Sequence, residues 1–258
     1  PNSFEGLKFL FSPDFSKITA KTILFAMGQA FFSLSLGMGA LITYSSYFKK
    51  SENLGVTAVN VSIADTAIAI LAGVVIFPAV FAFNIEPSAG PSLVFITLPE
   101  IFRQMPLGSL FGFIFFVLLS VAALTSTVSV LEVVVAYFSE EFKISRKKAI
   151  IIASGSISIL GVLASLSFGP LSNVLIFKKS IFDLLDFTAS NVLLPLGGLL
   201  IVIFVGWYMT SADIKDEVSN SGSLKVKLFP YYIFIVRFIA PLAIAAIFIY
   251  SIFYGSLG

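Results

Sequence analysis

Apolar residues run through this chain in six long blocks, separated by segments that are polar or rich in Pro and Gly. Each block is long enough for an α-helix to cross the roughly 30 Å hydrocarbon core of a bilayer. The pattern predicts an all-α polytopic membrane protein, with one transmembrane domain over residues 1–258. The six expected spans are Thr22–Phe48, Val59–Phe83, Leu107–Phe138, Lys147–Phe168, Asp186–Tyr208 and Tyr231–Tyr254.

Composition supports this class and narrows the chemistry. Hydrophobic residues make up 58% of the 258 positions and charged residues 12%, whereas soluble domains carry about 25% charged residues. The absence of Cys and His excludes disulfide frameworks, thiolate nucleophiles and almost every zinc site. Carboxylates, hydroxyls and backbone carbonyls remain, and such hard oxygen ligands suit alkali cations. We expect no enzyme and, from the net charge of +2, no nucleic-acid partner.

Basic residues in the connecting segments predict the orientation. One set of loops contains Lys49, Lys50, Lys143, Arg146, Lys147, Lys148, Lys215, Lys225 and Lys227. The opposite set contains fewer, namely Lys8, Lys17, Lys21, Arg103, Lys178 and Lys179. Because cytoplasmic loops carry the excess of Lys and Arg, we expect the first set in the cytoplasm and both chain ends outside.

Two further segments bear on organisation. The outer loop Asn84–Pro106 is rich in Pro and Gly and contains an apolar stretch at Phe95–Phe102, which predicts a short loop helix. A loop of this length is more often functional than idle. The chain starts at Pro1 without an initiator Met or a signal-peptide layout. We therefore expect it to be a piece of a longer protein.

The first block is the most informative, because Gly37 and Gly39 lie in mid-membrane beside Ser33 and Ser35. Glycine is a poor helix former and serine competes for backbone partners. Such a span can divide into two half-helices that expose backbone groups to a ligand, with a positive helix end facing a carboxylate. The alternative is that these small residues pack against another helix.

Two carboxylates fall inside predicted spans, where a charge is costly unless it is paired or solvated. Asp65, in the second span, is expected to face a cation, an Arg or a proton, unless it lies at the cytoplasmic interface and is simply hydrated. Glu132, in the third span, could carry a proton, line a cavity or pair with a helix outside this chain. The sequence does not choose between these roles for Glu132.

Hydroxyl groups cluster in the third span at Thr125, Ser126 and Ser129, within about one helical turn. With a free carbonyl nearby, these oxygens could hold a dehydrated Na⁺. The alternative is that each hydroxyl bonds back to the preceding turn.

The fifth span has acidic residues at its outer mouth, Asp183 and Asp186. They are either a solvated helix start favoured by the dipole or gate residues awaiting a cation. Pro195 and the pair Gly197-Gly198 predict a kink in the same span.

These residues together resemble the neurotransmitter:sodium symporter family, in its bacterial amino-acid transporter branch. The specific stretches are Gln29–Tyr47, Leu124–Ser126 and Asp186–Trp207. The resemblance covers essentially the whole chain and corresponds to the family's sixth to eleventh membrane helices. It implies the second inverted repeat of the leucine-transporter-like fold plus one extra helix, with substrate and sodium near the midplane. The family's first five helices would be the missing N-terminal half.

The resemblance also implies two sodium sites. The first matches Ser33 and Asp65, and the second matches the Ala122 carbonyl and the Thr125 and Ser126 hydroxyls. Many members have Asn where Asp65 stands, and Ala69 falls where relatives carry a chloride-site Ser or a substituting acid. We therefore expect Asp65 to supply the negative charge, so that chloride is not required.

By the same comparison, the substrate pocket is lined by Phe32, Ser35, Gly37, Met38, Ser126 and Val130. Met38 stands where a leucine-transporting relative has a bulkier Phe, and Met repacks easily. This favours a large hydrophobic or aromatic amino acid. Asp186 matches the extracellular gate residue, whose Arg partner would lie in the missing half.

The expected function is sodium-coupled symport across a bacterial plasma membrane by alternating access, with Asn84–Pro106 as an outer lid and no organic cofactor. One alternative is a proton-coupled or exchange transporter of the same fold, in which Glu132 or Asp65 would titrate. A second is a non-transporting membrane subunit. An intramembrane hydrolase using Asp65 and Glu132 is the most distant.

Overall fold

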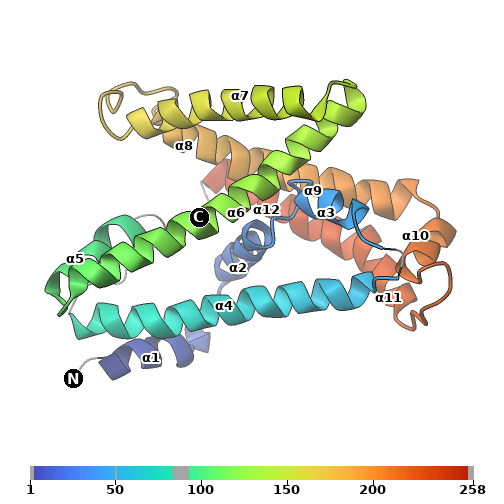
Figure 1. Cartoon of the computed structure of the whole chain (residues 1–258). Helices are drawn as coiled ribbons and strands as arrows, with labels where there is room; N and C mark the ends of the chain where they lie inside the picture. The colour runs from blue at the N-terminus through green and yellow to red at the C-terminus, as the bar shows by residue number, and fades with distance from the viewer. Residues whose placement is uncertain (1–2, 50, 84–92, 255–258) are drawn as a thin grey trace. The chain divides into compact units, whose positions relative to one another are not determined.

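The structure, a computed structural model that describes residues 3–49, 51–83 and 93–254, is built almost entirely of helices (Figure 1). This confirms the all-α polytopic class. Within the described ranges, five helical stretches are long and apolar enough to cross a membrane. They are Leu54–Ala82, Gly108–Glu141, Arg146–Leu166, Ile181–Tyr208 and Phe229–Phe253.

The chain divides into two compact units. Unit 1 contains residues 1–21 and 58–126, and unit 2 contains residues 22–57 and 127–257. Three boundaries fall inside continuous helices, namely α2 (Ala20–Ser33), α4 (Leu54–Ala82) and α6 (Gly108–Glu141), so each of these helices contributes to both units.

Unit 1 is organised around α4 and the first part of α6. Its other elements are α1 (Ser3–Phe11), η1 (Phe15–Lys17), η2 (Leu93–Thr97) and α5 (Leu98–Gln104). Helix α1 lies along α4 (Figure 1), where the ring of Phe9 packs 5.1 Å from that of Phe77. Val80, Leu98 and Ile101 form a fully buried cluster that fastens α5 to α4.

Unit 2 contains the rest of α6 and most of the remaining helices. These are α2 (Ala20–Ser33), α3 (Ala40–Ser46), α7 (Arg146–Leu166), α8 (Ile181–Asp186), η3 (Phe187–Leu193), α9 (Leu194–Ile203), η4 (Phe204–Tyr208), α10 (Ser211–Val218), α11 (Phe229–Phe234), η5 (Ile235–Ile239) and α12 (Ala240–Tyr254). A second buried cluster, Val135, Ala149 and Ala153, joins α6 to α7.

Two of the membrane-length stretches in unit 2 contain wide π-helical turns, which the sequence did not predict. Such turns leave backbone groups outside the regular ladder. One of these backbone groups, the Gly206 carbonyl in η4, accepts a hydrogen bond from Arg237 Nε in η5 at 2.6 Å. Trp207 returns a bond from Nε1 to the Arg237 carbonyl at 3.1 Å. The reciprocal pair fastens η4 to η5.

Some helix ends differ from the predicted span limits. Helix α4 begins at Leu54 instead of Val59, and the stretch expected from Asp186 begins at Ile181, because Ser180 and Asp183 form a capping box there. The loop helix expected at Phe95–Phe102 consists of η2 and α5, over residues 93–104. Residues 84–92 of the same outer loop lie outside the described ranges.

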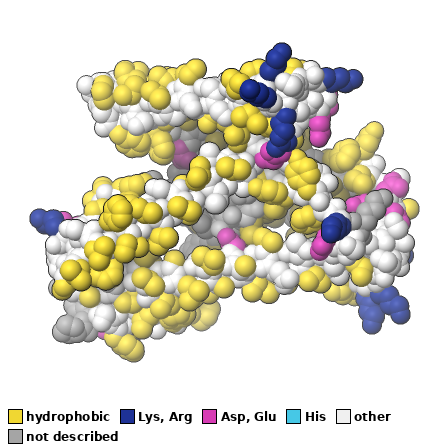
Figure 2. Space-filling model, in the orientation of Figure 1, with side chains coloured by type: hydrophobic (Ala, Val, Ile, Leu, Met, Phe, Trp, Pro, Cys, Tyr) yellow, Lys and Arg dark blue, Asp and Glu magenta, His cyan; other side chains and the backbone are white. Residues whose placement is uncertain are grey.

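Hydrophobic side chains cover much of the visible surface of the long helices, whereas Lys and Arg gather near helix ends (Figure 2). An aqueous protein rarely exposes so much contiguous apolar area. The distribution is that of helices whose surroundings are lipid or other membrane helices.

Candidate functional site

The first predicted span is divided, and the division has a definite geometry. Helix α2 ends at Ser33 and α3 begins at Ala40; we call residues 34–39 between them the interruption. Leu36 N–H donates to Phe31 O at 3.0 Å and Ser35 N–H to Phe32 O at 2.9 Å. This pair of bonds is a Schellman motif, which closes a helix with a left-handed residue. Ser35, with φ 53°, takes that position in place of the usual Gly.

Position 37 requires glycine for two reasons, its left-handed backbone conformation and its close approach to the backbone of α9. Its φ is 84°, in the left-handed region. A Cβ at this position would collide with the Leu194 carbonyl oxygen and stand 2.8 Å from the Gly198 nitrogen. The backbone of the interruption therefore lies directly against α9, at the paired glycines that the sequence marked as a kink.

Helix α3 is fastened to α6 by two tyrosines one turn apart. The Tyr44 hydroxyl donates to Ser129 Oγ, and the Tyr47 hydroxyl donates to Glu132 Oε1 at 2.8 Å. Arg146, at the start of α7, donates to the other carboxylate oxygen of Glu132 at 2.5 Å. Glu132 thus joins α3, α6 and α7 within unit 2. Its partners lie in this chain, and Tyr47 and Arg146 were both missed as site residues.

The candidate second sodium ligands lie within one turn of α6 in unit 1. The Thr125 hydroxyl donates to the Ala122 carbonyl at 2.7 Å, and Ser126 is the next residue. The oxygens of Thr125 and Ala122 are therefore adjacent, as a shared cation would need. The same bond is the local back-bonding that the sequence offered as the alternative.

The candidate first sodium ligands fall in different units. Ser33 is the last residue of α2 in unit 2, and Asp65 lies on α4 in unit 1. Because α4 begins at Leu54, Asp65 is about three turns inside its helix instead of two.

Four of the predicted substrate-lining residues, Phe32, Ser35, Gly37 and Met38, are grouped at the end of α2 and in the interruption. Val130 lies on the unit 2 part of α6, and Ser126 on the unit 1 part, four residues earlier on the same helix.

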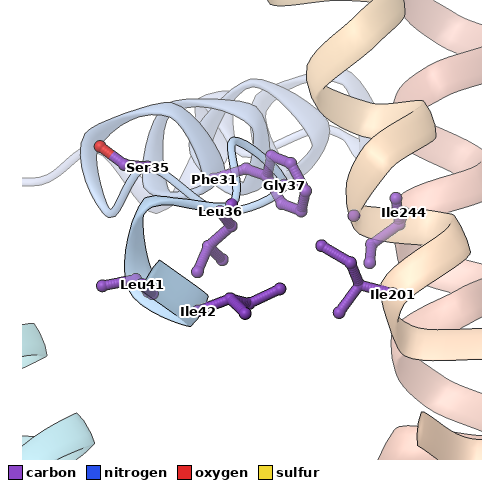
Figure 3. Close-up of a pocket in the computed structure, with 10 residues that line it drawn as sticks. Phe31, Ser35, Leu36, Gly37, Leu41, Ile42, Ile201 and Ile244 are labelled. Carbon is purple, nitrogen blue, oxygen red and sulfur yellow. The ribbon is translucent and has the colours of Figure 1, made fainter. Parts of the chain in front are cut away.

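Behind the interruption is an apolar cavity of about 220 Å³. The side chains of Leu36, Ile42, Ile201 and Ile244 converge on it, whereas the Ser35 hydroxyl points away from them (Figure 3). The interruption therefore has an apolar side toward α9 and α12, and a different side that carries the Ser35 hydroxyl.

The two outer acidic residues have separate roles in the structure. Asp183 completes the capping box of α8: its backbone N–H donates to Ser180 Oγ at 3.1 Å, and its carboxylate accepts from the Ser180 backbone N–H at 3.4 Å and from the Ser180 hydroxyl at 2.7 Å. Asp186 is exposed and accepts from Ser190 Oγ at 3.2 Å. The helix-start interpretation fits Asp183, and Asp186 is left available to a partner.

The loop helix α5 carries an exposed ion pair. Arg103 donates to Glu100 from Nη2 at 2.7 Å and from Nε at 3.0 Å, and Gln104 donates to the same carboxylate at 3.0 Å. These donors, Arg103 first, hold the pKa of Glu100 below its ordinary value.

Comparison with known proteins gives a consistent result. Residues 1–256 match the Sodium:neurotransmitter symporter family. The crystal structure of MhsT in complex with L-phenylalanine is 50% identical, with a TM-score of 0.83 over 95% of this chain. The uncharacterized sodium-dependent transporter YhdH of Bacillus subtilis is 41% identical over 96% of the chain, and an uncharacterized sodium-dependent transporter of Haemophilus influenzae is 44% identical over 98%.

The chain spans about half the length of the relatives that it matches. It covers 55% of each of the two bacterial transporters and 56% of the MhsT chain.

Proposed function

This chain belongs to the sodium:neurotransmitter symporter family, and we propose that, within a longer protein, it works in sodium-coupled symport of a hydrophobic or aromatic amino acid by alternating access. The family resemblance and the leucine-transporter-like fold predicted from the sequence are confirmed. The relatives are sodium-dependent transporters and not enzymes, as expected.

The observation that carries the proposal is the interrupted membrane helix. A helix divided at 34–39 interrupts the regular backbone ladder inside an apolar span. A polar ligand could bind backbone groups there, together with the Ser35 hydroxyl, which points away from the apolar cavity (Figure 3). A 50%-identical relative was solved with L-phenylalanine. In our proposal Phe32, Ser35, Gly37, Met38, Ser126 and Val130 line the pocket, and Met38 makes room for an aromatic side chain.

Two cations would be carried with the substrate. The adjacent Ala122 carbonyl and Thr125 hydroxyl, with Ser126, would replace water around one Na⁺. Ser33 and Asp65 would hold the other, close to the substrate carboxylate. Because Asp65 brings its own negative charge, transport would not need chloride.

Access would alternate between two closures. On the outside, Asp186 would close against an Arg from the part of the protein that this chain lacks, beneath the lid loop 84–106. On the side that the basic loops place in the cytoplasm, Tyr47, Glu132 and Arg146 would hold α3 against α6 and α7 while the outside is open. The protein would reside in a bacterial plasma membrane.

The experiment is Na⁺ titration of labelled L-phenylalanine binding to the complete purified protein. Thr125→Val is expected to raise the half-saturating Na⁺ concentration about tenfold or more, because one cation ligand is lost, at about 1.4 kcal/mol per tenfold. Ser120→Ala is the matched control, since Ser120 also bonds back along α6, to Phe116 O. Binding indifferent to Na⁺ in the parent protein would overturn the proposal.

A further inference from the structure

The connection between α7 and α8 ends in a tight hairpin. Ile176 and Lys179 exchange backbone hydrogen bonds at 2.9 and 3.0 Å. The two residues at the tip, Phe177 and Lys178, have φ values of 51° and 65°. A two-residue turn with both residues left-handed strongly favours Asn-Gly, so a Phe-Lys tip is strained.

Residues in such strained conformations cluster at functional sites. The Phe177 side chain is 87% exposed, the most exposed large hydrophobic among the described residues. Val174 and Leu175, just before the hairpin, are also exposed. The turn therefore presents a projecting apolar tip that water solvates poorly.

Charge distinguishes this tip from an ordinary apolar loop. Residues 167–180 contain two Lys and no Asp or Glu, in a loop that the distribution of basic residues predicts to lie outside. Lys178 is exposed beside Phe177. Arg146–Leu166 and Ile181–Tyr208 are both long and apolar enough to cross a membrane, so the loop that joins them would emerge at a membrane surface.

We propose that this hairpin docks on the outer leaflet of the bilayer, with Phe177 in the boundary between headgroups and acyl chains and Lys178 against the phosphate of an anionic phospholipid. Apolar residues beside basic ones are the composition that binds such surfaces. The inference rests on the orientation in the proposed function, and it does not depend on transport.

The loop that ends in the hairpin contacts the membrane stretch that carries Asp186. The Lys179 ammonium lies 4.5 Å from the ring centre of Phe187. At the base of the loop, Phe182 packs 4.9 Å from the Phe168 ring and donates from its N–H to Ser167 Oγ at 3.3 Å. A docked tip therefore holds the outer end of α8 against the membrane surface.

The test is the depth of a spin label at Leu175→Cys in the complete protein, with any other Cys replaced. The protein is reconstituted in vesicles of phosphatidylcholine, with or without phosphatidylglycerol. The ratio of oxygen to nickel-chelate accessibility is measured. It should be several-fold higher than at Ser221→Cys, an exposed control in a loop on the opposite side, and should rise further with phosphatidylglycerol.

Two added substitutions separate the parts of the contact. Phe177→Ser should return the label at 175 to water in both vesicle types, and Lys178→Gln should abolish only the increment from phosphatidylglycerol. A label fully accessible to the nickel chelate would overturn the proposal. So would a label shielded from both reagents, because the rest of the longer protein would then cover the tip. The accessibility measurements need neither Na⁺ nor substrate, so this proposal can be tested even if the proposed transport function is wrong.

Discussion

Gly37 is the residue on which the geometry of the interruption depends most. Gly37→Ala would place an L-residue in a left-handed conformation, at about 1–2 kcal/mol, and would press its Cβ into the backbone of α9, at a further 1–3 kcal/mol or so for overpacking. We expect a lower thermal midpoint and loss of L-phenylalanine binding, both measured on the purified complete protein.

Gly161 provides the matched control, since it lies within α7 and a Cβ there meets nothing within 4 Å. Gly161→Ala should leave stability unchanged or raise it by about 0.5–1 kcal/mol through helix propensity. If Gly37→Ala and Gly161→Ala changed the thermal midpoint and binding equally, the close contact with α9 would not be the reason that position 37 requires glycine.

Glu132 allows a second test at the scale of single residues. Arg146→Met would leave a carboxylate that is 19% exposed without its cationic partner. Because Arg146 itself is 58% exposed, solvent screens the pair and we expect only a small loss of stability. Glu132→Gln should cost less, since the amide still accepts from Tyr47. Chemical unfolding measures both, with the exposed Glu140→Gln as control; a larger loss from Glu132→Gln would contradict the assignment.

The residues that could be predicted from the sequence share one property, which is that their signal is local. Gly37 and Gly39 inside an apolar block predict a divided helix, and Thr125 with Ser126 predicts a hydroxyl cluster. Tyr47 and Arg146 carry no local signal, because each meets Glu132 only through the fold. The capping box of Ser180 and Asp183 also has a local signal, because its spacing is visible in the sequence.

At the scale of elements, two substitutions of Ser35 at the end of α2 distinguish an effect on stability from an effect on substrate binding. Ser35→Gly would relieve the left-handed strain in the Schellman motif and should raise the unfolding free energy by up to about 1 kcal/mol. Ser35→Ala would relieve nothing. Both remove the hydroxyl proposed to contact substrate, so both should weaken L-phenylalanine binding. Unchanged binding in both variants would remove Ser35 from the pocket.

The loop helix α5 should respond to acid. The pKa of Glu100 is lowered in the folded protein by Arg103, so its contribution to stability is complete above the ordinary carboxyl value of 4.5 and is lost as pH falls through the folded value. Amide exchange over residues 98–104, corrected for intrinsic rates, should accelerate there. Arg103→Gln should remove most of this pH dependence, and an unaltered profile would contradict the assignment.

Element ends and π-helical turns show where prediction from sequence stopped. Hydropathy located the long helices but placed the start of α4 at Val59 instead of Leu54, because Gly55 and Thr57 are weak helix formers and made the first turn look like part of the loop. The turns η4 and η5 are joined by bonds between elements, from Arg237 to the Gly206 carbonyl and from Trp207 to the Arg237 carbonyl, and no local pattern encodes such contacts.

At the scale of the whole molecule, the class and family followed from the sequence because they depend on composition and on a few motifs spread along the chain. The assembled site did not. Ser33 and Asp65 belong to different units, and the chain covers only about half of its relatives' length. The pairing of these residues, and the partner of Asp186, therefore remain proposals.

The most direct measurement is uptake of labelled L-phenylalanine by the complete protein in proteoliposomes, with an inward Na⁺ gradient or with K⁺ in its place, in chloride and in gluconate. The account predicts concentrative uptake with Na⁺ alone, equal in both anions, and lost with Asp65→Ala. Uptake that persists in K⁺ and follows a proton gradient would contradict it.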